Sequence, residues 1–280
     1  PKTEAIVNPK GGSLFARNVT VGGYSGGNIT ELSTGDGKSL NLPVEQPPVV
    51  PWGTPTEWAS VRNYEHLVTK DGDWAPAIQA AIDSGAKTVY FPVNGSAPRY
   101  VLKTPVRVRA NVVRLFGMRN GLDADEQALA GPPAVVFESA QPAVSVERLN
   151  IASALHSGPC DLIVTCGGIN TLDATAGCGR LFLEDFLAPL RLNKHQRVWA
   201  RHLNIEMRET KIVNNGGQLW VLGYKTEGRG CNLLNTNGAR TEILGGLMYV
   251  TDKPAKDVPM FENRDSDLTL VHLTSGYVGM

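Results

Sequence analysis

The sequence predicts an all-β fold, a right-handed parallel β-helix built from stacked coils of about 21 residues. The main observation is a repeat, in which WARHLNIE, WVLGYKTE and EILGGLMY begin at residues 199, 220 and 242, at intervals of 21 and 22 residues. Polar turns at 214–217 and 235–238 precede the second and third copies, so each unit is a turn followed by a short strand. The near absence of helices between strands excludes a doubly wound sheet, and a β-sandwich is the less favoured alternative.

The sequence of the N-terminal part of the chain is typical of the end of another solenoid. Residues 4–42 alternate short apolar runs with Gly, Asn and Asp turns, and NPKGGSLFARNV at 8–19 is similar to the later repeats. We therefore expect residues 1–42 to be the closing coils of a preceding β-helix, which makes such a domain a candidate partner packing alongside. Residues 43–55 are rich in proline, which donates no backbone hydrogen bond, and are predicted to be a linker.

A β-helix domain is predicted over residues 56–280, and it starts with a capping helix near 73–84. Asp73 is placed to cap this helix and Gly85 to end it. Four apolar residues fall on one face of the helix, namely Trp74, Ile78, Ala81 and Ile82. A helix in this position covers the open end of a stack of strands, which otherwise exposes unpaired backbone groups.

Short apolar strands continue to residue 186. They are predicted at 87–93, 100–118, 134–139, 144–151, 161–166 and 180–186. The polar segment 120–133, bounded by Pro and Gly, is predicted to leave the coil as an excursion.

Composition limits the partners of the chain. The 27 Lys and Arg balance the 27 Asp and Glu, and no basic tract is interleaved with aromatic residues, which argues against a nucleic-acid partner. No apolar run approaches the roughly 18 residues that span a bilayer, so no membrane partner is expected. Sequons at Asn18, Asn28 and Asn94 favour a secreted or extracellular protein, although the chain shows no signal peptide.

The cysteines indicate neither a metal site nor a cofactor. They lack CxxC spacing, so no zinc site is predicted, and buried thiols are favoured over a disulfide. The four positions are Cys160, Cys166, Cys178 and Cys231.

Two stretches resemble a known superfamily. Residues 75–108, APAIQAAIDSGAKTVYFPVNGSAPRYVLKTPVRV, are similar to the opening of the pectate-lyase-like β-helix superfamily, with a capping helix and a strand ending in Phe-Pro. The chain departs from that pattern at 70–76, where a Gly-Asp-Gly-x-x-Asp-Asp-Thr run is contracted to KDGDWAP. Residues 198–230 and 237–249 resemble the second β-helix of proteins related to family 55 glycoside hydrolases, which implies a carbohydrate ligand and favours inversion.

The candidate catalytic residues form a predicted ladder of carboxylates. Alignment of LFLE, LNIE and YKTE puts Glu184, Glu206 and Glu227 on one line, with strands about 4.8 Å apart. Neighbouring carboxylates then approach the ~5–5.5 Å of retaining glycosidases, and alternate ones approach the ~6.5–9.5 Å of inverting enzymes. We assign Glu206 as general acid and Glu184 or Glu227 as base, with Asp185 as a substitute if the register slips.

The candidate substrate-binding residues lie on the same strands. Alternation points Trp220 outward, where an indole can stack on a sugar ring, and Tyr224 extends this platform. Arg201 and Lys225 are polar contacts for the substrate, or they neutralise the glutamates as ordinary ion pairs. The alternative for Trp220 is a position beneath a loop or against the preceding β-helix.

The sequence therefore predicts a glycoside hydrolase that acts on a polysaccharide or oligosaccharide of the β-glucan type. The alternative is a non-catalytic β-helix that binds glycans or builds a surface structure, and a polysaccharide lyase is third. A raised pKa of Glu206 within a groove would favour the hydrolase, whereas a solvated Glu206 would favour the binding protein.

Overall fold

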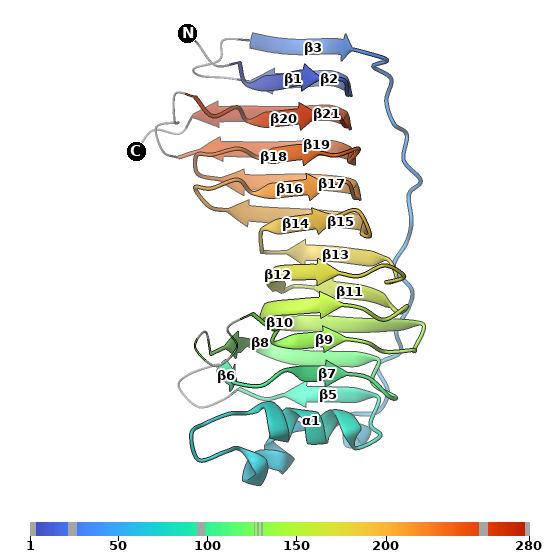
Figure 1. Cartoon of the computed structure of the whole chain (residues 1–280), viewed down its shortest axis with the longest axis vertical. Helices are drawn as coiled ribbons and strands as arrows, with labels where there is room; N and C mark the ends of the chain where they lie inside the picture. Colours follow the sequence, from blue (N-terminus) through green and yellow to red (C-terminus); the bar gives the residue numbers. More distant parts are fainter. Residues whose placement is uncertain are drawn as a thin grey trace. The chain divides into compact units, whose positions relative to one another are not determined.

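The computed structural model describes residues 4–21, 27–93, 99–125, 127, 129, 131–251 and 257–277. It confirms an all-β protein whose sheets consist mainly of parallel strands (Figure 1). The chain divides into unit 1, residues 1–45 with 183–280, and unit 2, residues 46–182. In the described part of the chain, no helix is both long and apolar enough to cross a membrane.

Unit 1 contains two ladders of strands, which are parallel except that β3 pairs antiparallel with β2. The longer ladder runs in the order β3-β2-β21-β19-β17-β15 and the shorter in the order β1-β20-β18-β16-β14. The longer strands are β2 (Ser13–Val21), β3 (Gly27–Thr34), β15 (Arg197–Glu206), β17 (Gln218–Glu227), β19 (Arg240–Val250) and β21 (Asp267–Tyr277). The shorter strands are β1 (Ile6–Lys10), β14 (Leu190–Asn193), β16 (Ile212–Asn215), β18 (Leu233–Thr236) and β20 (Phe261–Arg264).

The strand register of unit 1 follows the repeats in the sequence. Trp199 pairs with Trp220, and Trp220 pairs with Glu242. These three residues are the first residues of the three sequence repeats, so the repeat intervals of 21 and 22 residues are also the strand register. The apolar residues expected to face inward are buried: Leu181, Leu183, Leu203, Ile205, Leu219 and Val221. Buried apolar side chains that alternate along parallel strands provide the main stabilisation of this unit.

The N-terminal strands belong to the same unit as the C-terminal ones. β1 pairs with β20, and β2 pairs in parallel with β21 through Leu14–Leu268 and Ala16–Leu270. This pairing replaces our expectation that residues 1–42 close a separate, preceding β-helix. The repeat-like sequence at 8–19 forms strands because it pairs with the last strand of the stack, β21. The paired residues are more than 240 positions apart in the sequence.

The long parallel strands each contain a corner residue with positive φ. In unit 1 this corner is occupied by Asp185, His202, Gly223, Gly245, His272 and Asn18. Strand β13 (Leu181–Phe186), at the boundary of the two units, contains the first of them. The corner residues stack on one another, since Asp185 contacts the His202 ring and Asn18 lies 2.7 Å from Nδ1 of His272.

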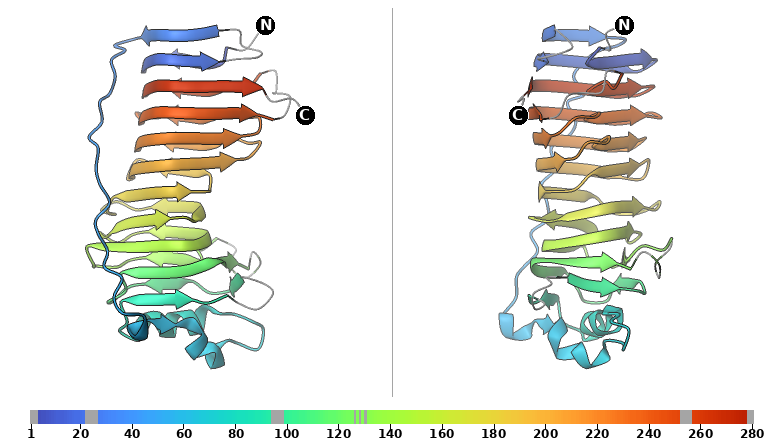
Figure 2. Two further views of the ribbon diagram at one scale, coloured as in Figure 1. Left: turned by 180° about the vertical axis from the view of Figure 1, so that it is seen from behind. Right: turned by 90° about the vertical axis from the view of Figure 1, so that its left-hand side faces the viewer.

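An extended segment, residues 35–54, here called the strap, follows β3 (Figure 2). In unit 1 it crosses the outer face of the long strands. The buried carboxylate of Glu242 accepts hydrogen bonds from Asn41 N at 3.1 Å and Leu42 N at 2.9 Å. Trp199 Nε1 donates to Pro43 O at 2.8 Å. The predicted linker is therefore bound to the sheet along its length within unit 1.

Unit 2 begins with two 3₁₀ helices, η1 (Pro55–Glu57) and η2 (Val61–Leu67), and the helix α1 (Ala75–Asp83). Its central ladder runs β4-β5-β8-β10-β11, while β6 pairs with β8, β12 with β10, and β9 with both β7 and β10. The strands are β4 (Ala59–Ser60), β5 (Thr88–Phe91), β6 (Arg99–Leu102), β7 (Val106–Val108), β8 (Arg114–Ala124), β9 (Val135–Phe137), β10 (Ala143–His156), β11 (Asp161–Thr165) and β12 (Gly168–Ala174). Strand β8 extends into the predicted excursion at 120–133, which is therefore partly strand.

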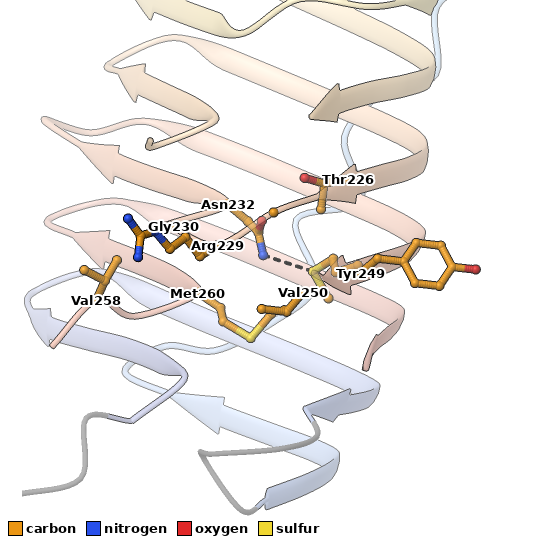
Figure 3. A pocket seen from close by; sticks show the side chains of 10 residues that line it. Thr226, Arg229, Gly230, Asn232, Tyr249, Val250, Val258 and Met260 are labelled. Carbon is orange, nitrogen blue, oxygen red and sulfur yellow. Dashed lines mark hydrogen bonds between the residues drawn. The ribbon is translucent and has the colours of Figure 1, made fainter. Parts of the chain in front are cut away.

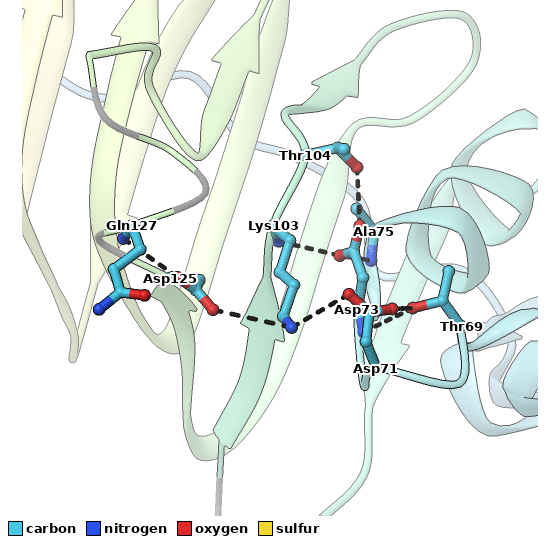
Figure 4. A network of polar contacts seen from close by, with 8 residues as sticks. All are labelled: Thr69, Asp71, Asp73, Ala75, Lys103, Thr104, Asp125 and Gln127. Atoms are coloured by element: carbon cyan, nitrogen blue, oxygen red, sulfur yellow. Dashed lines mark hydrogen bonds and ion pairs between the residues drawn. The ribbon is translucent and has the colours of Figure 1, made fainter.

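The helix α1 forms where the sequence predicts it, and it packs on β7, β4 and η2. Asp73, which is 5% exposed, accepts hydrogen bonds from Ala75 N, Lys103 N and Thr104 Oγ1 at 2.9–3.0 Å (Figure 4). Lys103 Nζ bonds Asp71 at 3.1 Å. Asp73 thus ties the start of the helix to the end of β6. The sequon at Asn94 lies outside the described residues.

Candidate functional site

The predicted carboxylates Glu206 and Glu227 are neighbours on adjacent strands of unit 1. The register of β15 and β17 pairs them, as the repeats predict. Between them lies Lys225, whose Nζ contacts Glu206 and donates to Glu227 Oε1 at 2.5 Å. The Glu206 and Glu227 side chains are 48% and 40% exposed, so this cluster is a solvated ion-pair network.

The electrostatics of Glu206 are opposite to those of a general acid. Lys225 and Asn204, which both donate to its carboxylate, hold the pKa of Glu206 below its usual value. A general acid in a glycosidase needs a raised pKa, so that it carries a proton near neutral pH. Glu206 instead stays ionised, which is the behaviour that we associated with the binding protein.

The corner residues place Glu184 away from the other two glutamates. Asp185 and His202 contact each other and both have positive φ, so they occupy equivalent corners of adjacent strands. Glu184 comes one residue before the corner residue Asp185, so its equivalent on β15 is Arg201, one residue before His202. Glu206 instead comes four residues after His202. The LFLE segment is therefore offset from LNIE, and this corrects the predicted ladder. Asp185 is paired with His202 and does not substitute for Glu184.

The predicted aromatic platform is buried. Trp220 is 3% exposed and Tyr224 is 1% exposed, so neither presents a ring to a sugar. Arg201 covers Trp220, with its guanidinium 5.3 Å from the ring centroid, and donates to Glu45 O at 2.5 Å. Trp220 therefore lies beneath the strap, as in the alternative that the sequence left open, and Arg201 is a contact of the strap.

The cavity beside Glu227 is too small for a sugar. It measures about 20 Å³ and is lined by residues around the turn that follows β17 (Figure 3). This volume holds a single water molecule. Tyr249, which pairs with Glu227 in the register, points away from the cavity.

A larger cleft lies in unit 2. Its volume is about 520 Å³, and we call it the tryptophan cleft. The lining residues are Pro51, Trp52, Gly53, Glu57, Trp58, Gly85, Ala86, Lys87, Thr88, Val113 and Gln141. Clefts of roughly 300–1,000 Å³ bind small-molecule ligands, so this volume is sufficient for a sugar.

The aromatic residues of the cleft form a connected cluster. The Trp52 and Trp58 centroids lie 5.9 Å apart, and Phe116 meets the Trp52 ring edge-on at 5.1 Å. Trp58 also approaches Tyr90 at 6.0 Å. Trp52 is nevertheless 46% exposed, so part of this aromatic cluster is open to solvent.

Polar contacts hold the cluster in place. Trp58 Nε1 donates to Trp52 O at 3.2 Å. The Arg114 guanidinium, which is 2% exposed at the residue level, lies 3.9 Å from the Trp52 centroid and forms an ion pair with Glu147. Burial lowers the pKa of Arg114, although an arginine remains charged at physiological pH.

The sequence patterns did not predict the tryptophan cleft. Trp52 and Trp58 stand in PWGTPTEW at 51–58, which we interpreted as the end of a linker and the start of a domain. Two tryptophans six residues apart in a proline-rich, non-helical segment were the available signal. Proline limits the conformations of such a segment and presents aromatic side chains at little entropic cost.

The chain was compared with protein-family models, with curated proteins and with solved structures, and none of the three comparisons found a match.

Proposed function

We propose that this protein is a right-handed parallel β-helix that binds a polysaccharide or oligosaccharide in the tryptophan cleft without hydrolysing it. Parallel pairing from β15 through β17 and β19 to β21, together with the intervals of 21 and 22 residues, supports the β-helix. A glycan partner of this kind is met outside the cell, in agreement with the proposed secretion.

The exposed Trp52 ring within a cleft of about 520 Å³ is the observation that carries the proposal. An indole stacks on the apolar face of a sugar ring, and polar groups around it bind the hydroxyls. The cleft supplies such groups in Glu57, Lys87 and Gln141. The Lys87 ammonium is a hydrogen-bond donor, the Glu57 carboxylate is an acceptor, and the Gln141 amide is both. This set matches sugar hydroxyls, which both donate and accept.

The lining of the cleft favours binding over hydrolysis. Among the described lining residues, Glu57 is the one carboxylate. Both inverting and retaining mechanisms in their usual form require two carboxyl groups on either side of the scissile bond. A single exposed carboxylate provides a hydrogen-bond acceptor and lacks the second catalytic group.

Binding is tested by calorimetric titration of a panel of soluble glycans that includes β-1,3-glucan. The comparison uses the unmodified chain, Trp52→Ala and Trp58→Ala, with Tyr249→Ala as the matched control because Tyr249 is a partly exposed aromatic residue outside the cleft. We expect Trp52→Ala to lose roughly tenfold or more in affinity, from lost ring stacking and lost apolar contact. The proposal fails if no glycan binds, or if Tyr249→Ala weakens binding as much as Trp52→Ala.

A glycoside hydrolase is the second candidate, because the register places Glu206 and Glu227 on adjacent strands. The separation of neighbouring strands, about 4.8 Å, is near that of a retaining pair. Reducing-end release from the same panel, compared between the unmodified chain and Glu206→Gln, decides this. A loss of at least about a hundredfold in the variant would establish acid catalysis by Glu206; absence of release would leave binding as the activity.

A further inference from the structure

We propose that Arg114 is a positioning residue for glycan binding, which fixes the Trp52 ring so that one of its faces is covered and the other is open to the ligand. This inference rests on the proposed function of the tryptophan cleft. It adds a residue that does not line the cleft and that is almost fully buried.

The strap needs such an anchor at Trp52. Residues 46–54 have no helical or strand structure, so no ladder of backbone hydrogen bonds orients the side chains there. An exposed tryptophan on irregular backbone would sample several rotamers, and binding would then require their restriction at a cost of ~0.5–1.5 kcal/mol. A contact that selects one rotamer in the free protein removes that cost.

Arg114 provides this contact through three interactions. Its guanidinium carbon lies 3.9 Å from the centroid of the Trp52 ring, a short distance for a cation–π contact. Its NH2 group donates to Val50 O at 2.5 Å, two residues before Trp52. Its NH1 group forms an ion pair with Glu147, whose carboxylate also accepts a hydrogen bond from Ser145 at 2.7 Å.

The geometry leaves one face of the indole for a ligand. The guanidinium lies over one face of the ring. The Phe116 and Trp58 rings approach Trp52 at centroid distances of 5.1 and 5.9 Å, with interplanar angles of 84° and 34°, so neither is stacked in parallel on the indole. Trp52 keeps 46% of its surface exposed beside these three neighbours, and we take the face opposite the guanidinium as the surface offered to the ligand. A planar guanidinium suits this role better than an ammonium group, because it stacks on the indole and still bonds the backbone and a carboxylate.

The test combines an affinity with a signal from Trp52 itself. The chain has five tryptophans, so protein labelled with 5-fluorotryptophan gives five ¹⁹F resonances, and Trp52→Phe identifies the one that belongs to Trp52. The test variant is Arg114→Lys, which keeps a charge next to Glu147 and loses the planar stacking. Arg109→Lys is the matched control, because Arg109 is an exposed arginine of the same unit that is paired with Asp83.

We expect Arg114→Lys to shift or broaden the Trp52 resonance and to leave those of Trp74, Trp199 and Trp220 in place. It should also weaken binding of a soluble β-1,3-glucan oligosaccharide by roughly two- to tenfold. Arg109→Lys should change neither. Since Arg114→Met alone leaves Glu147 without its partner, Arg114→Met/Glu147→Gln is the second variant, and it should show the same two effects.

The inference is overturned if the Trp52 resonance is unchanged in both variants, or if it changes while affinity for a glycan that the unmodified protein binds does not. If the unmodified protein binds no glycan, the proposed function fails by itself. The ¹⁹F signal then still decides whether Arg114 holds Trp52, because it needs no ligand.

Discussion

Lys211 shows, at the scale of a single residue, how burial changes charge in this protein. The residue is fully buried, and its Nζ donates to Arg229 O at 3.0 Å and to Gly228 O at 3.4 Å. Burial lowers its pKa to about 8 from an ordinary value of 10.5. Carbonyl oxygens bind the amine but supply no full negative charge, so the charged form is costly there.

The first prediction is that Lys211 makes the protein more stable as pH rises. Between the folded pKa of about 8 and the unfolded value of 10.5, the unfolded chain binds more protons, so the free energy of unfolding increases with pH. The gain over this window is on the order of 3 kcal/mol. Lys211→Met should lack it when unfolding by urea is measured from pH 7.5 to 10.5.

A comparison of two chains is necessary because buried thiols act in the opposite direction. Burial raises the pKa of Cys160 and of Cys231 to about 11, so their contribution to stability is lost as pH rises above the unfolded value of 9. The loss from Cys160 is common to the unmodified chain and Lys211→Met and cancels in the difference. The loss from Cys231 cancels in large part, because Lys211 is a minor cause of its pKa beside burial. Parallel stability curves for the two chains would contradict the prediction.

The second prediction concerns the ion pair of Glu206. Lys225→Met removes the main cause of the lowered pKa of Glu206, and we expect that pKa to rise toward its ordinary value of 4.5. The carboxyl ¹³C shift of Glu206 across a pH titration measures it. In Glu227→Gln, which keeps Lys225 next to Glu206, the pKa should remain low; a low value in Lys225→Met as well would show that the lysine is not responsible.

At the scale of elements, the third prediction compares two aspartates at the start of α1. Asp73→Ala leaves the donors of Ala75, Lys103 and Thr104 without their acceptor in a buried position, and should cost about 2–4 kcal/mol of unfolding free energy. Asp71→Ala is the control, because its side chain is 66% exposed and its partner Lys103 can be hydrated. Guanidinium unfolding should show a clear loss for Asp73→Ala and little change for Asp71→Ala.

The elements that the sequence predicted are those governed by local pattern. Alternation identified the inward side chains Leu203, Ile205, Leu219 and Val221, and apolar spacing identified α1, whose N-cap is Trp74 in place of the expected Asp73. The corners were not visible, because a backbone conformation that favours glycine is filled in unit 1 by Asp185, His202 and His272 as well as by Gly223 and Gly245. This is why Glu184 was aligned with Glu206, although Glu184 comes before the corner of its strand and Glu206 comes after the corner of the next strand.

The burial of Trp220 was hidden for a different reason. Alternation indicates on which face of a strand a residue lies, and it carries no information about what covers that face. The strap, whose contacts with Glu242 and Trp199 span about 150 to 200 residues of sequence, covers the outer row here. The same segment continues into unit 2, where it carries the exposed Trp52. The predicted aromatic site at Trp220 and the observed one at Trp52 therefore differ, because tertiary contacts of the strap are not encoded in any local pattern.

At the scale of the whole molecule, the distribution of contacts along the chain determines which parts unfold together. Unit 1 joins the two ends of the sequence, since β1 and β2 pair with β20 and β21, whereas unit 2 is made of one continuous stretch, 46–182. Contacts between distant residues form only after a long loop closes, which is entropically costly and slow. Unit 1 therefore depends on residues from both ends of the chain, and unit 2 does not.

The last prediction follows for a chain that starts at residue 35 and so lacks β1, β2 and β3. In that chain β20 loses its partner β1 and β21 loses its partner β2, while each keeps its other neighbour, β18 or β19. Both strands become exposed edges, with backbone donors and acceptors open to water. We expect amide hydrogen exchange at Leu268 and Leu270 to accelerate by at least about tenfold, as local opening becomes easier. Amides of Val144 and Val146 in β10 should keep their protection, because their ladder lies within unit 2. Equal acceleration in both strands would mean that the two units unfold as one, and protection retained in β21 would mean that the N-terminal strands add little to unit 1.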